Sequence, residues 1–209
     1  MKIKVCGLKY RENIEQILTM NFDYLGFIFF PGSPRFVENE LEVDYIRSIT
    51  EVEKVGVFVN ENIKTVLNIV DKYLIDYVQL HGNENPAYVE QISKYCKVIK
   101  VFHADEKLSL IHFKEFESAS FYLFETLTIL HGGSGKSFDH SILNDLKINK
   151  PFLLSGGIHH SDFDSNKINH PNFIGIDVNS RYEISPAIKN INELQLLTNK
   201  YKINHASSR

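Results

Sequence analysis

The chain has 209 residues, of which 43% are hydrophobic and 12% aromatic, enough for the core of one domain or two small ones. Its formal net charge of -3 provides no basic surface, so nucleic acid is not an expected partner. No apolar run approaches the roughly 20 residues of a membrane-spanning helix, and the first residues, MKIKVCGLKY, do not form a secretory signal. Cys6 and Cys96 lack the CxxC spacing of a zinc or redox pair. We therefore expect a reduced, cytoplasmic protein that does not bind a membrane.

Short runs typical of β-strands recur at intervals of about 25 residues. In chain order they are 2–6, 24–30, 54–59, 76–80, 97–102, 120–125, 151–155 and 173–178. Apolar residues at helical spacing lie between several of them, in 12–20, 61–74 and 85–96, and Pro86 suits a first helical turn.

Eight such strand–helix units predict an α/β fold, a single-domain (β/α)8 TIM barrel over residues 1–209. The sequence contains no linker, and the polar segment 203–209 is expected to be a frayed tail. A six-stranded doubly wound sheet is the alternative, but it leaves two strands without a place.

In such a barrel, chemistry takes place where the strands end and the following loops begin. This rule selects a set of polar and glycine residues as candidates for catalysis or substrate binding. They are Cys6, Arg35, Asn60, Gln79, His81, Glu125, Gly156, Gly157, Asp177, Asn179 and Ser180.

Cys6 lies at the end of the first predicted strand, on the same face as Lys4, because side chains alternate along a strand. Ile3 and Val5 then face the helices, and Lys4 and Cys6 face the barrel interior. A nearby ammonium group lowers a thiol pKa and favours the reactive thiolate. The alternative is a buried cysteine that only fills space.

Glu125 ends an apolar strand, and its neighbours Leu123 and Phe124 suggest partial burial. Burial raises a carboxyl pKa and allows the group to donate a proton near neutral pH. The alternative is a glutamate that reaches solvent or forms an ion pair with a lysine.

Two polar segments predict a phosphate site. Gly156 and Gly157 suggest a tight turn with accessible backbone N–H groups that leads into a helix, and Asp177 to Ser180 follow the eighth strand. Barrel enzymes often bind phosphate between these two loops, although ordinary turns and caps would have the same composition. Arg35, in the rigid segment PGSPRFV, could bind a carboxylate in a bidentate manner or form a surface salt bridge.

Two other patterns carry less information. GGSGKS (132–137) resembles the end of a Walker A phosphate loop, but Leu130 stands where that motif requires glycine. The nine histidines include the adjacent pair His159 and His160 without an HExxH or comparable spacing, so no metal site is expected.

The motifs together resemble the phosphoribosylanthranilate isomerases, enzymes of tryptophan biosynthesis. The resemblance rests on KVCGL, SPRFV, VGVFVN, QLHG, GGSGKSFD, LSGGI, GIDVNSRYE and SPAIK, in this order between residue 2 and about residue 190. It implies that GGSGKSFD is the sixth loop of the barrel, which covers a phosphosugar.

The resemblance implies a cofactor-free Amadori rearrangement of N-(5-phosphoribosyl)anthranilate to 1-(2-carboxyphenylamino)-1-deoxyribulose 5-phosphate by general acid/base catalysis. Cys6 would be the base, Glu125 the acid, and Arg35 the ligand of the anthranilate carboxylate. The further substrate-binding residues would be Gln79, Gly156, Gly157, Asp177, Asn179 and Ser180. The expected partner is a small phosphosugar, and the expected assembly is a monomer or homodimer.

This chain departs from the family pattern at three positions. Glu125 replaces the aspartate of the sixth strand, and the added methylene extends the carboxyl by roughly 1.3–1.5 Å, where about 1 Å can cost on the order of 10²-fold in rate. Arg181 replaces a glycine and is expected to pair with the phosphate or with Glu183, while His140 replaces a tryptophan. Two alternatives therefore stay open: an isomerase for another phosphosugar, and a phosphate-binding barrel without catalysis.

Overall fold

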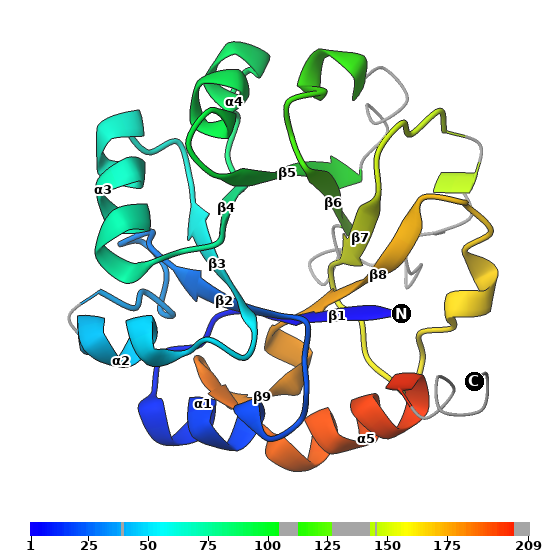
Figure 1. Cartoon of the computed structure of the whole chain (residues 1–209). Helices are drawn as coiled ribbons and strands as arrows, with labels where there is room; N and C mark the ends of the chain where they lie inside the picture. The colour runs from blue at the N-terminus through cyan, green and yellow to red at the C-terminus, as the bar shows by residue number, and fades with distance from the viewer. Residues whose placement is uncertain (39, 105–112, 127–142, 145, 203–209) are drawn as a thin grey trace.

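A computed structural model describes residues 1–38, 40–104, 113–126, 143–144 and 146–202 of the chain. Eight parallel strands form a closed barrel in which each strand pairs with the next and β8 pairs with β1 (Figure 1). The strands are β1 (Lys2–Val5), β2 (Tyr24–Ile28), β3 (Glu53–Phe58), β4 (Tyr77–Leu80), β5 (Lys97–Ala104), β6 (Phe121–Thr126), β7 (Phe152–Ser155) and β8 (Phe173–Val178). The predicted barrel is confirmed, and the doubly wound alternative is wrong because the eight strands form a closed sheet without edge strands, in which the first strand pairs with the last.

The helices lie outside the barrel (Figure 1). The α-helices of the described ranges are α1 (Arg11–Leu18), α2 (Val43–Ser48), α3 (Ile63–Tyr73), α4 (Pro86–Ser93) and α5 (Ile191–Lys202). Asn62 and Asn85 cap α3 and α4, because each side chain accepts a hydrogen bond from a backbone N–H of the first turn. Pro86 occupies the first turn of α4, as predicted.

The connection between β7 and β8 differs from the prediction. Gly156 and Gly157 do not lead into an α-helix; a turn follows them, and then the short 3-10 helix η4 (Ser165–Lys167). The segment offers few apolar residues at helical spacing, and Asp164 instead caps the 3-10 turn. The chain after β8 also contains elements that the strand–helix pattern did not predict: the 3-10 helix η5 (Ser180–Tyr182) and a hairpin of β9 (Glu183–Ser185) and β10 (Ile188–Lys189).

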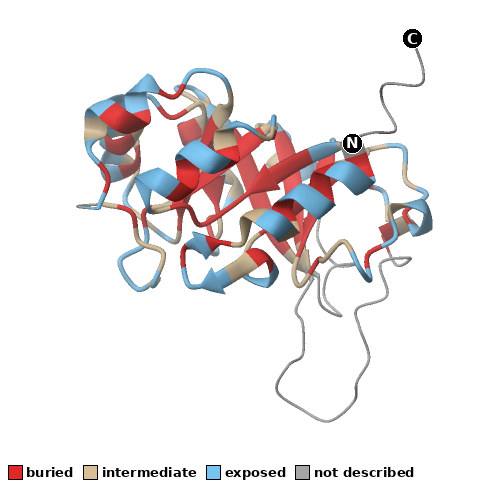
Figure 2. Cartoon of the chain, turned by 90° about the horizontal axis from the view of Figure 1, so that it is seen from below, coloured by how far each residue is buried: buried red, intermediate tan, exposed pale blue. Residues whose placement is uncertain are grey.

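The core has two parts because the side chains of a barrel strand alternate between two faces. Ile3 and Val5 belong to the outer part, between strands and helices, while Lys4 is fully buried inside the barrel, as predicted. The inner part consists of Tyr24, Val55, Ile99, Val101, Phe121, Leu123 and Leu153. Figure 2 shows the resulting pattern: the strands are buried, and the helices are exposed on their outer faces.

Several predictions concern segments outside the described residues: the sixth loop with GGSGKS, His140, and the tail 203–209. None of the helices in the described ranges combines the length and apolarity needed to cross a lipid bilayer.

The seam between β1 and β8 depends on Gly175. A Cβ atom at this position would overlap the backbone of Lys2, which cannot move without breaking the strand pairing. We expect Gly175→Ala to lower the free energy of unfolding by about 1–3 kcal/mol, measured by urea denaturation. Gly32→Ala is the matched control, because its Cβ would meet only the exposed ring of Phe30, and we expect a change within about 0.5 kcal/mol. Equal effects of the two substitutions would contradict this account of the seam.

Candidate active site

Cys6 directly follows β1, at the carboxyl end of the barrel. Its backbone N–H donates a hydrogen bond to the carbonyl of Val178 (2.9 Å), and its side chain is buried. Gly26 of β2 leaves the space that the sulfur occupies, since a Cβ atom at Gly26 would lie 2.7 Å from Cys6 Sγ. The thiol is therefore held against the inner surface of the barrel.

A buried ion pair lies beside this thiol. Lys4 Nζ is 2.9 Å from Asp177 Oδ1, and both side chains are at most 5% exposed. Lys4 and Asp177 are opposite each other in the pairing of β1 with β8, so the ion pair spans the seam of the barrel. Ser155 Oγ donates to the other carboxylate oxygen at 3.4 Å. Asp177 thus lies within β8, inside the predicted strand 173–178, and only Asn179 and Ser180 of the predicted polar segment follow the strand.

The pKa of Cys6 is raised above its ordinary value. Burial is the main cause, Lys4 opposes it, and the carboxylate of Asp177 adds to the rise. The prediction that Lys4 would favour the thiolate is therefore wrong in its net result, because Asp177 offsets much of the ammonium charge and burial prevails. Free Cys6 is a thiol at neutral pH.

Glu125 belongs to β6, and two histidines contact one of its carboxylate oxygens. His81 Nε2 lies 3.1 Å and His103 Nδ1 3.2 Å from Glu125 Oε2. Burial raises the pKa of Glu125, but the two imidazoles lower it by a larger amount, so the net pKa is below the ordinary value. The prediction of a raised pKa is wrong, since it considered only the apolar neighbours along the strand.

Gln79 and His81 come from β4 and the residue after it. Gln79 Nε2 is 3.2 Å from His81 Nδ1, so when the amide donates there, the imidazole carries its hydrogen on Nε2 and donates it to Glu125. Gln79 is buried, and its Oε1 has no hydrogen-bond partner in the part of the chain that the structure describes. This oxygen is an acceptor available to a ligand.

His103 is a site residue that the sequence analysis did not select. It lies opposite Glu125 in the pairing of β5 with β6, so the strand register alone brings the two side chains together. The predicted strand ended at residue 102, two positions before the end of β5, so His103 was not recognised as a strand-end residue.

Arg35 is not a surface residue with a loosely held side chain. Its Nε and Nη2 donate to the two carboxylate oxygens of Glu183 at 2.8 and 2.5 Å, and Glu183 also accepts from Lys189 Nζ at 2.7 Å. Lys189 in turn donates to Asn179 Oδ1 at 2.7 Å. The network fixes one edge of the Arg35 guanidinium, and no hydrogen bond within the described residues uses the other edge.

Arg181 does not pair with Glu183, one of its two predicted partners. Glu183 binds Arg35 instead, and Arg181 Nη1 donates to the carbonyl of Gly157 (2.8 Å) and contacts the carboxylate of Asp162. This side chain connects the loop after β7 with the loop after β8.

The two loops predicted to hold phosphate lie side by side as a result. Gly156 and Gly157 have φ values of 94° and 62°, a conformation that favours glycine, and both residues are half-buried. Asn179 precedes η5, and Ser180 is its first residue.

A chain of contacts connects the two proton-transfer candidates. Cys6 Sγ and Lys4 Nζ both lie beside Gly26, and Lys4 pairs with Asp177. Asp177 accepts a hydrogen bond from Ser155, which lies opposite Glu125 in the pairing of β6 with β7. Cys6 and Glu125 therefore lie at the same end of the barrel.

Asn60 is a candidate with a structural role. Its Oδ1 accepts from the N–H of Asn83 (2.8 Å), and its own N–H donates to Glu84 (2.8 Å), which pairs with Lys100 at 2.9 Å. These contacts join the loops after β3 and β4.

The Glu183 network gives a pH-dependent prediction. Burial raises the pKa of Glu183, but Arg35 and Lys189 lower it to below its ordinary value of 4.5. Its contribution to stability is therefore complete above that value and is lost as the pH falls through the lower pKa of the folded state. We expect Glu183→Gln to lower the free energy of unfolding by about 3 kcal/mol at pH 7, with a smaller difference only below about pH 4.5. Urea denaturation across this range measures both quantities.

The exposed glutamate of α4 provides the control: Glu90→Gln should change stability by less than about 0.5 kcal/mol at every pH. A Glu183→Gln deficit that is constant down to acid unfolding would contradict the assignment of an ion pair.

The comparisons with known proteins agree with one another. A family model described as N-(5'phosphoribosyl)anthranilate (PRA) isomerase matches residues 3–200. The chain is 39% identical to the N-(5'-phosphoribosyl)anthranilate isomerase of Parabacteroides distasonis over 93% of this chain and 90% of that protein. It is 35% identical to the enzyme of the same name from Phocaeicola vulgatus, over 97% and 98% of the two chains.

Among solved structures, phosphoribosyl anthranilate isomerase from Thermotoga maritima matches with a TM-score of 0.82 and 26% identity, over 97% of this chain and 98% of that one. The sequence, the eight-stranded barrel and the arrangement of its carboxyl end lead to the same assignment. The chain belongs to the N-(5'-phosphoribosyl)anthranilate isomerase family.

Proposed function

We propose that this protein isomerises N-(5'-phosphoribosyl)anthranilate to 1-(2-carboxyphenylamino)-1-deoxyribulose 5-phosphate, with Cys6 as the base and Glu125 as the acid. The observation that supports the proposal is the chain of contacts from Lys4, beside Cys6, through Asp177 and Ser155 to the position of Glu125. A thiol and a carboxyl group at one end of the barrel are the two proton-transfer groups that the rearrangement needs.

The charged ends of the substrate match two parts of the site. Backbone groups at Gly156 and Gly157, together with Asn179 and Ser180, suit the phosphate. The free edge of the Arg35 guanidinium suits the anthranilate carboxylate, since Glu183 already holds the other edge in place.

The ribose would lie between these ends. There, Gln79 Oε1 and the carboxylate of Asp177 can accept hydrogen bonds from its hydroxyl groups. The substrate would thus be fixed at three points, with its reacting carbons near Cys6 and Glu125.

The resting protonation states suggest how the reaction begins. Cys6 rests as a thiol and Glu125 as a carboxylate, because their pKa values are shifted in opposite directions. Transfer of the thiol proton to Glu125, directly or through a water molecule, forms the base and the acid together. Glu125 then protonates the ring oxygen of the ribose, the bond from C1 to that oxygen breaks, and a cationic Schiff base forms.

The second half of the reaction restores the enzyme. The positive charge of the Schiff base stabilises the thiolate of Cys6, which removes the proton from C2 of the opened sugar. The electron pair of that C–H bond neutralises the Schiff base, and the resulting enol tautomerises to the ketone. Cys6 is again a thiol and Glu125 again a carboxylate, so no external acid or base is consumed.

Loss of either group should stop this cycle. We expect Cys6→Ala and Glu125→Gln each to lower kcat by about 10²–10⁴-fold, measured by the loss of substrate fluorescence. Cys96→Ala is the control, because Cys96 lies after α4 and forms no part of the site, and it should keep parental activity. The thermal midpoint of each variant separates lost chemistry from lost folding, and a folded, fully active Glu125→Gln would disprove the acid assignment.

A growth experiment tests the function against the alternative of a phosphate-binding barrel without catalysis. The parental gene should restore growth of a tryptophan auxotroph that lacks this isomerase, and the Cys6→Ala gene should not. If a well-expressed parental protein fails to restore growth, the alternative of a phosphate-binding barrel without catalysis is favoured. If the purified protein converts only a different phosphosugar, the proposed substrate is wrong.

The histidines around Glu125 give a prediction on pH dependence. The charge and hydrogen bond of His103 help to lower the pKa of Glu125, so His103→Ala should raise that pKa. Glu125 is the group of the pair with the lower pKa, so it sets the acidic limb of the kcat/KM profile, and that limb should move upward. A profile that keeps its shape while kcat falls would show that His103 has only a packing role.

A further inference from the structure

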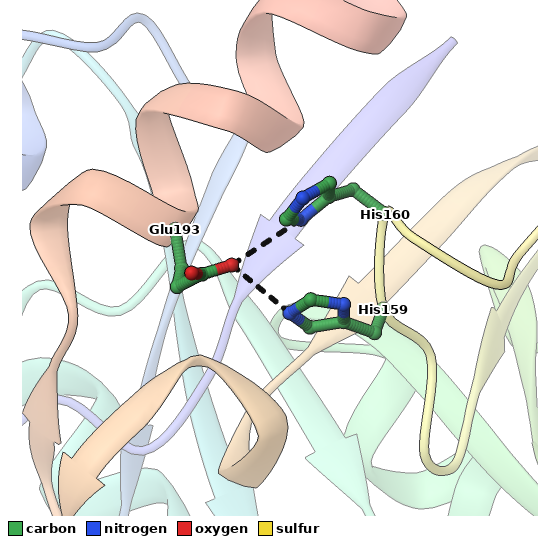
Figure 3. A group of neighbouring side chains, drawn as sticks. All are labelled: His159, His160 and Glu193. Carbon is green, nitrogen blue, oxygen red and sulfur yellow. Dashed lines mark hydrogen bonds and ion pairs between the residues drawn. The ribbon is translucent and has the colours of Figure 1, made fainter.

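A second group of ionisable side chains lies outside the proposed active site. His159 and His160 belong to the turn after β7, and Glu193 lies in the first turn of α5 (Figure 3). The two imidazoles and the carboxylate point toward one another, and each keeps between 16% and 33% of its side chain exposed. They are therefore sheltered but still accessible from solvent.

The spacing of the three atoms suits a small cation. His159 Nε2 lies 3.1 Å and His160 Nδ1 3.5 Å from Glu193 Oε2, and all three atoms lie within 4.8 Å of one another. Ligands that surround zinc tetrahedrally at about 2.0–2.1 Å are about 3.3 Å apart. Two of the three separations already match, and small side-chain rotations would close the third.

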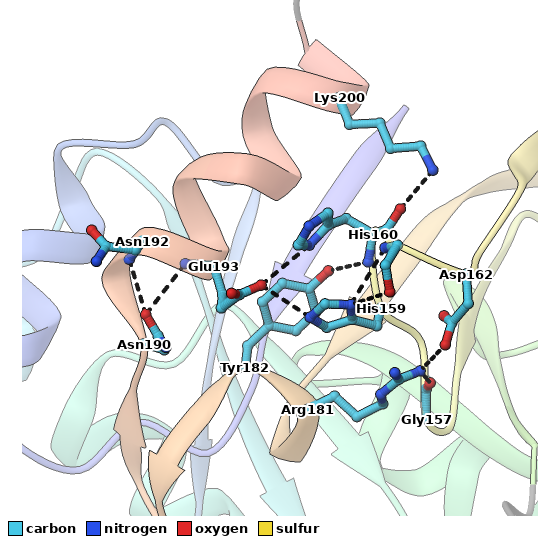
Figure 4. A network of polar contacts seen from close by, with 11 residues as sticks. Gly157, His159, His160, Asp162, Arg181, Tyr182, Asn190, Asn192, Glu193 and Lys200 are labelled. Atoms are coloured by element: carbon cyan, nitrogen blue, oxygen red, sulfur yellow. Dashed lines mark hydrogen bonds and ion pairs between the residues drawn. The ribbon is translucent and has the colours of Figure 1, made fainter.

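The two imidazoles are held by contacts of their own (Figure 4). His159 Nδ1 forms a hydrogen bond with Ser161 Oγ (2.8 Å) and accepts one from the backbone N–H of Ser161 (3.3 Å), while Nε2 is directed at Glu193. Metal binding at Nε2 requires the tautomer in which Nδ1–H donates to Ser161 Oγ. Tyr182 stacks on the His159 ring with centroids 4.9 Å apart, and its hydroxyl oxygen accepts from the N–H of His160 (2.6 Å). Hydrogen bonds to the far nitrogen of a histidine and packing around its ring are typical of metal ligands.

His160 provides a lone pair without another use. Its Nδ1 is buried and has no hydrogen-bond partner among the described residues. A buried imidazole nitrogen without a hydrogen-bond partner can instead coordinate a metal ion.

Nearby charges limit the affinity of this cluster for a cation. Lys200 Nζ donates to the carbonyl of His160 (2.6 Å), and its positive charge disfavours a cation. Arg181 is nearby but is paired with Asp162. Glu193 supplies one negative charge to the cluster itself, so moderate affinity is expected.

We propose that His159, His160 and Glu193 bind a divalent transition-metal ion, with Zn²⁺ as the best match for two imidazoles and one carboxylate. Hard cations such as Mg²⁺ prefer oxygen ligands and would bind more weakly. The ion connects the turn after β7 to α5, and a fourth position stays open to water. Because this arrangement exists only in the folded chain, binding stabilises the fold.

The sequence pattern does not reveal such a site. His159 and His160 are adjacent, and Glu193 follows His159 by 34 positions. The prediction of no metal site relied on short ligand spacings, which cannot detect a ligand supplied by a later helix.

Calorimetry on the full-length protein, first treated with EDTA and dialysed, tests the site with ZnCl2 as the probe. We expect one equivalent of Zn²⁺ to bind and the thermal midpoint to rise with zinc concentration. His160→Gln and Glu193→Gln should each weaken binding by at least about tenfold and abolish the rise, and Ser161→Ala should weaken it by about tenfold. Thermal midpoints in EDTA show whether the variants are folded.

Two controls identify the site of binding. Glu90→Gln removes an exposed carboxylate from α4, on the opposite side of the barrel from α5 (Figure 1), and should leave zinc affinity unchanged. His103→Ala and Cys6→Ala test whether zinc binds at the catalytic groups instead, and they too should leave it unchanged. The proposal is overturned if the parent binds no zinc at about 1 mM, or if folded Glu193→Gln binds it as the parent does.

Discussion

The buried ion pair of Lys4 and Asp177 is the interaction on which the rest of the site depends. It joins the first and last strands at the seam of the barrel, where both side chains are shielded from water. Each charge would be costly to bury alone, so the pair persists only while both strands are in place. Its two charges act on Cys6 in opposite directions, which leaves burial to decide the protonation of the thiol.

The same region shifts the pKa values of the two proton-transfer groups in opposite directions. A base should rest without its proton and an acid with it, yet burial keeps the proton on Cys6 and two histidines keep it off Glu125. Cys6 and Glu125 together hold the one proton that the reaction needs, but Cys6 carries it in place of Glu125. Transfer of that proton from Cys6 to Glu125 gives the active arrangement. The active form holds one proton between the two groups, so the lower pKa, that of Glu125, sets the acidic limb of the pH–rate profile and the higher pKa, that of Cys6, sets the basic limb.

Much of the fold was predictable because it depends on local patterns. The alternation of side chains along the first strand predicted Lys4 inside the barrel and Ile3 and Val5 outside it. The glycines at residues 156 and 157 indicated a turn, and both have left-handed backbone angles. Protonation was not predictable, because the pKa of Cys6 depends on burial inside the closed barrel and that of Glu125 on histidines from two other strand ends. The partner of Arg35 was missed for the same reason, since Glu183 lies 148 residues later in the chain.

The closure of the barrel also has a consequence for synthesis. Lys4 and Asp177 are separated by 173 positions, so Lys4 is made long before its partner. At about 5–20 residues per second, a ribosome needs roughly 9–35 s to span that distance. Throughout this interval the first strand of the nascent chain cannot complete its pairing, which makes it a natural contact for a chaperone.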